Sequence, residues 1–151
     1  LGRINISVAS LPVIVGAMLY GPVGGLLVGL LGAFMGQLLT YGVTATTILW
    51  ILPQAARGLL VGVYAKHCGY KFSSGQLTLA LIGTALVVTA LNTGAMYIDS
   101  VIYNYYSYAY VFGGLVVRII SGAATAVLMV FVAPPVVNLL NRSLDTVRTA
   151  Q

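Results

Sequence analysis

Two arginines, Arg57 and Arg118, lie inside long apolar segments rather than at their ends. A charge in the middle of a membrane span is costly unless it contacts a partner or a water-filled cavity. The only acidic residues, Asp99 and Asp145, lie outside the apolar centres. The arginines can therefore hydrogen-bond backbone carbonyls, pair with another subunit, or bind an anionic ligand. We favour the ligand for at least one of them, because a guanidinium offers a planar fork of donors to a carboxylate.

Polar side chains near the arginines support a ligand cavity. Trp50, Gln54 and Arg57 are spaced by four and three residues, so they share one helix face. Asn92 and Tyr97 belong to a polar stripe on the next apolar segment. An aromatic ring, amides and a cation on facing helices are typical of a binding site.

Six of the ten tyrosines fall between residues 97 and 110. They form either an aromatic belt at a membrane interface or a loop that covers a site and stacks on a flat ligand, and both interpretations remain open. With two tyrosines taken from this run, the predicted substrate-binding residues are Trp50, Gln54, Arg57, Asn92, Tyr97, Tyr106 and Arg118.

Residues for catalysis or cofactor binding are sparse. His67 and Cys68 are the only histidine and the only cysteine, too few to complete a zinc site. The apolar segments hold no acid and base pair, and the chain has no phosphate-binding glycine loop. We therefore expect neither an enzyme nor a metal or cofactor, and we assign any ATP hydrolysis to a different chain.

The composition identifies the environment of these residues. Of the 151 residues, 60% are hydrophobic and only 6% are charged, whereas a soluble domain has about a quarter of its residues charged. Soluble, disordered and disulfide-rich classes are excluded together. The seven basic residues are scattered rather than clustered, which argues against nucleic-acid binding. The chain is predicted to lie in a membrane.

The apolar segments predict an all-α polytopic membrane bundle that forms one domain over residues 1–151. Glycines recur at positions 25, 29, 32 and 36 and again at 58 and 62, which favours close helix packing. Five transmembrane helices are expected at residues 4–20, 23–39, 46–65, 76–97 and 111–140, followed by a cytoplasmic tail at 141–151.

The positive charges predict the orientation. The 66–71 loop and the tail, with Arg142 and Arg148, hold four basic residues, and Arg3 lies alone on the opposite side with Asp99. By the positive-inside rule the C-terminus is cytoplasmic and the N-terminus is outside. Because the chain starts at Leu1 and has no cleavable signal, we infer a further helix before it, six in the complete protein.

The run INISVASLPVIVGAMLYGPVGGLLVGLLGAFMGQLL, residues 4–39, resembles the substrate-binding S components of energy-coupling factor (ECF) vitamin transporters. LPQAARGLLVG at 52–62, Leu91-Asn92-Thr93, the tyrosine run and Arg118 resemble later helices of that family. The chain departs from folate-type members at Ala33, which leaves pantothenate or another acidic vitamin as alternatives to a folate-like one.

The resemblance implies the substrate-binding subunit of an ATP-driven importer in a bacterial or archaeal plasma membrane. It would capture a water-soluble vitamin from outside, and the unpaired arginines make an anionic one the expected ligand. The implied partners are a transmembrane coupling subunit, two ATPase subunits and the lipid bilayer. The alternatives are a non-transporting membrane scaffold or assembly subunit and, less favoured, a channel.

Overall fold

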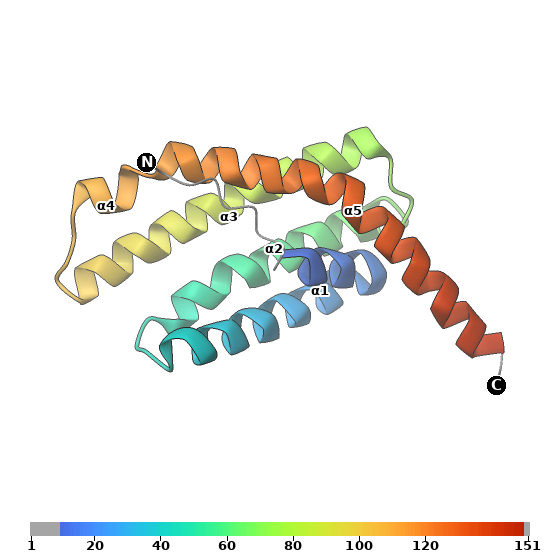
Figure 1. Ribbon diagram of the computed structural model, residues 1–151, viewed down its shortest axis with the longest axis horizontal. Coiled ribbons are helices and arrows are strands. Elements are labelled where there is room, and N and C mark those ends of the chain that lie inside the picture. Colours follow the sequence, from blue (N-terminus) through green and yellow to red (C-terminus); the bar gives the residue numbers. More distant parts are fainter. Residues whose placement is uncertain (1–9, 150–151) are drawn as a thin grey trace.

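The computed structural model describes residues 10–149, and the side chains of residues 10–145, as a helical bundle without a strand in that range (Figure 1). The all-α prediction is confirmed for these residues. The elements are α1 (Ser10–Tyr41), α2 (Thr47–His67), α3 (Ser74–Ile102), the short α4 (Tyr108–Phe112) and α5 (Leu115–Thr149). Among the described residues, four helices are long and apolar enough to cross a membrane, the fourth being the stretch Tyr108–Asp145.

The prediction of five spans is not supported, because the described residues hold four candidate spans and Ser10–Tyr41 counts as one of them. The further helix inferred before them is not supported either. Within α1 the helix is broken at Gly21, whose φ of 73° and ψ of −157° are non-helical. A Cβ on Gly16 would lie 3.0 Å from a methyl carbon of Val28, so the two arms of α1 fold back against each other. No polar loop separates them. Arg3 and the start of the first predicted helix lie outside the described residues.

The prolines of α5 do not end the helix. The sequence predicts a span over 111–140 and a polar tail at 141–151, but α5 begins at Leu115 and remains helical to Thr149, with Pro134 and Pro135 inside it. Its C-terminal part turns away from the bundle in Figure 1. A proline within a helix removes one backbone hydrogen bond and favours a kink without requiring the helix to stop.

Close backbone contact joins α1 to α2. A Cβ on Gly58 would overlap the carbonyl of Gly25, and a Cβ on Gly25 would overlap the carbonyl of Gly58, so neither position has room for a side chain. Gly29 and Gly62 make similar approaches to the backbone of the facing arm. The expected close packing therefore occurs at these four positions. The remaining members of the stripe, which face open space, are Gly32 and Gly36.

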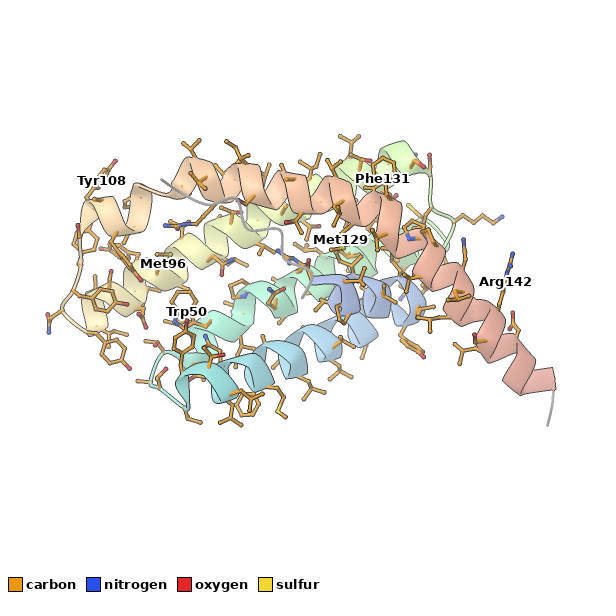
Figure 2. The ribbon with its side chains drawn as sticks, viewed as in Figure 1. Trp50, Met96, Tyr108, Met129, Phe131 and Arg142 are labelled. Carbon is orange, nitrogen blue, oxygen red and sulfur yellow. The ribbon has the colours of Figure 1, made fainter. Side chains whose placement is uncertain are left out.

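The bundle has two chemically different ends. At one end lie the α1–α2 connection and the segment between α3 and α5, and at the other lie Gly21, the 68–73 loop and the C-terminal part of α5 (Figure 1). Figure 2 shows Trp50 and Tyr108 toward the first end and Arg142 toward the second. Among the described side chains, Lys66 and Lys71 flank the loop of the second end, while Asp99 lies near the first.

Candidate functional site

A cavity of about 380 Å³ lies at the first end of the bundle. This volume falls within the range of small-molecule sites, which span roughly 300–1,000 Å³. Its aromatic lining consists of Tyr41, Trp50, Tyr103, Tyr105 and Tyr110. Its remaining lining consists of Gln37, Thr44, Thr46 and Asp99. None of these described lining residues is basic.

Asp99 is the charged group of this cavity. Its side chain is buried, with 8% of its surface exposed. The Thr46 hydroxyl donates to Oδ1 at 2.5 Å, and the Tyr105 hydroxyl donates to Oδ2. Trp50 lines the same cavity. The carboxylate thus ties the end of α3 to the α1–α2 connection and to the tyrosine-rich segment, using neutral donors in every case.

The α1–α2 connection positions Thr46 by its own hydrogen bonds. The backbone N–H of Thr44 donates to the Thr47 hydroxyl at 2.8 Å, and the hydroxyls of Thr44 and Thr46 lie 3.4 Å apart. Short hydroxyl side chains commonly bond nearby backbone groups in this way at turns and helix starts. Thr46 is 2% exposed, so its hydroxyl is held in the buried geometry that reaches Asp99.

The tyrosine-rich segment, residues 103–112, turns back over the cavity. Helix α3 ends at Ile102, and Asn104 follows with a φ of 58°, a left-handed conformation that asparagine tolerates better than most residues. The rings of Tyr105 and Tyr110 meet edge to face, with centroids 5.4 Å apart. The hydrogen bond to Asp99, with smaller effects of desolvation and charge, raises the pKa of Tyr105 above that of a free tyrosine.

Arg118 holds this segment from α5. Its guanidinium donates to the backbone carbonyls of Val111 at 2.9 Å and Tyr110 at 3.3 Å, and to the Thr93 hydroxyl at 3.3 Å. Of the roles that the sequence left open, hydrogen bonding to backbone carbonyls is the one observed. A cation suits the carbonyl end of the short α4, where the last C=O groups have no partner within the helix. Arg118 therefore positions Tyr110 rather than lining the cavity itself.

Arg57 lies in a separate and much smaller space. This second cavity measures about 20 Å³, room for roughly one water molecule, between α1, α2, α3 and α5. The Nη1 atom of Arg57 and the Oε1 atom of Gln54 are buried and have no hydrogen-bond partner in the described part of the chain. Trp50, Gln54 and Arg57, which the sequence placed on one helix face, therefore do not share one cavity. Only Trp50 lines the large cavity.

The other predicted residues do not line the large cavity. Tyr97 and Tyr106 contact each other edge to face, with ring centroids 5.5 Å apart, and both are about half exposed. Asn92 is half-buried on α3. Of the predicted set, the structure brings Trp50 to the cavity, while Asp99 and Thr46 were missed. The signal for Asp99 was its position as the only acid near the tyrosine run.

Comparison with known proteins identifies one family. The sequence model of the family described as "ECF transporter, substrate-specific component" matches residues 1–137, most of the chain. No curated protein and no solved structure matches.

Proposed function

The chain belongs to the family of ECF transporter substrate-specific components, and from this premise we propose that its large cavity captures a small water-soluble vitamin. Members of this family are membrane proteins that bind the transported substrate rather than enzymes. The observation that carries the proposal is the cavity of about 380 Å³ at one end of an apolar bundle, where a buried carboxylate and hydroxyls converge among aromatic rings.

The proposed orientation has the cavity end outside. Three of the five described lysines and arginines, Lys66, Lys71 and Arg142, lie at the opposite end, and lysine and arginine gather on the cytoplasmic side of membrane proteins. Arg118 lies near the cavity end, where its guanidinium donates to carbonyls of the chain itself. The C-terminus is then cytoplasmic. With this orientation a solute dissolved outside reaches the cavity without crossing the apolar part of the bundle.

We also propose the energy source and the partners. The chain has no glycine loop of the GxxxxGK[ST] kind, so ATP hydrolysis is assigned to two separate ATPase subunits that act through a transmembrane coupling subunit. The host membrane is the plasma membrane of a bacterium or archaeon. The chain itself supplies substrate recognition.

The anionic ligand expected from the sequence, pantothenate or a folate-like vitamin, depends on contact with Arg57 or Arg118. Neither residue lines the large cavity, and Arg118 already donates to two carbonyls. An anionic ligand would therefore require one of these side chains to change its position. The importer role does not depend on the charge of the ligand.

The test is uptake into proteoliposomes that contain this chain, a coupling subunit and two ATPase subunits. We expect a labelled vitamin to accumulate in the proteoliposomes when ATP is supplied on the side of the membrane that holds the ATPase subunits. We expect no accumulation when the nucleotide site of the ATPase subunits is inactivated. A scaffold or assembly subunit would give no uptake and no vitamin binding to the isolated chain. A channel would give flux without ATP, which also contradicts the proposal.

A further inference from the structure

We infer that the large cavity binds a flat ring carrying a positively charged N–H group, such as an amidinium or a protonated amino heterocycle. This inference rests on the proposed function, because it names the chemical class of the captured ligand. It replaces, for this cavity, the anionic class that the arginines suggested. It is carried by three features of the part of the wall that the structure describes: an unneutralised carboxylate, aromatic faces and the absence of a basic lining residue.

The negative charge of Asp99 is not cancelled by its described neighbours. Its observed donors, the hydroxyls of Thr46 and Tyr105, are neutral, and no described cation forms an ion pair with it. Hydrogen bonds from two hydroxyl donors favour the ionised form of a carboxyl group. A carboxylate can accept about four hydrogen bonds, so at least one acceptor direction remains for a ligand. A cationic N–H donor satisfies both that direction and the charge.

The aromatic wall suits the same ligand. Tyr41, Tyr103 and Tyr110 line the cavity together with Trp50, so a ligand bonded to Asp99 lies among π-faces. Rings of this kind attract cations through their electron-rich faces and stack on flat groups. The edge-to-face contact of Tyr105 with Tyr110 places one ring next to the carboxylate and another farther along the wall.

An anion is disfavoured in the same position. It would lie near the Asp99 carboxylate without a basic group of the described wall to offset the repulsion. Arg118 donates to Tyr110 and Val111, and Arg57 lines the other cavity, of about 20 Å³. Within the observed geometry neither guanidinium is available to a ligand beside Asp99.

Three probes of nearly equal size separate the classes: benzamidine, benzamide and benzoate, which are cationic, neutral and anionic at neutral pH. Trp50 is the only tryptophan and lines the cavity, so its fluorescence in the purified chain reports binding. We expect saturable binding with benzamidine at least about tenfold tighter than benzamide, as for a charged hydrogen bond worth roughly 1.5 kcal/mol, and benzoate weaker still.

Two variants test whether the preference for benzamidine depends on the negative charge of the cavity wall. Asp99→Asn keeps the side-chain shape and one acceptor oxygen but removes the charge, and it should weaken benzamidine about tenfold while leaving benzamide within about twofold. Gln37→Glu adds a second carboxylate to the wall without altering a hydrogen bond of Asp99, so it should strengthen benzamidine and weaken benzoate. Gln37→Glu keeps the test decisive if Asp99→Asn does not fold.

The inference is overturned if benzoate binds as tightly as benzamidine, if no probe binds, or if no folded variant changes the ratio of the benzamidine affinity to the benzoate affinity. These outcomes concern the isolated chain. The importer role is decided separately by ATP-dependent uptake in the proteoliposomes, so a chain that prefers benzoate and still transports loses the ligand class but keeps the function. A chain that prefers benzamidine and never transports keeps the cavity chemistry and loses the importer role.

Discussion

The guanidinium of Arg118 donates a hydrogen bond of 2.9 Å to the backbone carbonyl of Val111. This contact gives Arg118, in the first turn of α5, a structural task, because Val111 and Tyr110 belong to α4, which carries part of the cavity wall. The two glycines between α4 and α5, Gly113 and Gly114, provide no side chain that could fix the angle between the helices. The guanidinium provides that connection instead.

Arg118→Met should loosen the tyrosine-rich segment. Loss of hydrogen bonds from a charged group costs about 1.5–3 kcal/mol, so we expect a lower melting temperature in detergent and faster proteolytic cleavage within residues 103–112. Lys66→Met, at the other end of the bundle, is the control and should leave that cleavage unchanged. Equal protection of the segment in both variants would contradict the role given to Arg118.

Arg57→Met should stabilise the isolated chain. The substitution removes a buried Nη1 atom that has no hydrogen-bond partner in the described structure and keeps a similar apolar stem. An unsatisfied buried polar group costs about 1–3 kcal/mol, so we expect the melting temperature to rise. Lys71→Met in the exposed loop serves as the control. A marked fall in melting temperature for Arg57→Met would reveal a partner that the guanidinium requires.

Tyr105 should ionise only at unusually high pH, because its hydrogen bond to Asp99 raises its pKa. A raised folded-state pKa contributes stability that is complete below the unfolded value of about 10 and is lost as pH rises through the folded value. The stability difference between the native chain and Tyr105→Phe should therefore be constant near neutral pH and shrink under alkaline conditions.

Chemical unfolding at several pH values measures that difference, and near-ultraviolet absorbance follows the formation of tyrosinate. Tyr106→Phe is the matched control, since Tyr106 has no hydrogen bond to Asp99 among those observed. A stability difference for Tyr105→Phe that does not shrink under alkaline conditions would refute the assigned hydrogen bond.

Gly58→Ala should destabilise the bundle, whereas Gly32→Ala should not. A Cβ at position 58 meets the Gly25 carbonyl, and overpacking of this kind costs about 1–3 kcal/mol. A Cβ at position 32 meets nothing within 4 Å, so the change gains roughly 0.5–1 kcal/mol of helix propensity. Thermal unfolding of the two variants in one detergent compares them directly. An unchanged or higher melting temperature for Gly58→Ala would show that the α1–α2 contact is looser than observed.

The helical class and the position of the first break could be predicted from the sequence, but the count of helices could not. Hydropathy identifies apolar length, and Gly21-Pro22 marks an interruption, yet neither tells whether a loop separates the two arms. The prolines of α5 led to a wrong prediction of where the last helix ends, because the helix continues through Pro134 and Pro135.

The candidate site was predicted only in part, because residue type is visible in a sequence and contact is not. Trp50 was identified, since an aromatic ring next to polar residues on a helix face is a local pattern. The pairing of Thr46 with Asp99 joins residues 53 positions apart, which no local spacing reveals. The sequence predicted ligand contact for the arginines because an unpaired charge in a membrane is costly. In the structure the Arg118 guanidinium is instead stabilised by hydrogen bonds to backbone carbonyls.

The bond between Thr46 and Asp99 also has a consequence for biogenesis. Translation supplies the α1–α2 connection well before the end of α3, and the tyrosine-rich segment later still. The Thr46 hydroxyl consequently has no Asp99 partner until α3 has been synthesised and inserted into the membrane. The cavity is therefore completed late in insertion. A chain truncated before α4 would enter the bilayer with three of its long helices and an incomplete cavity wall.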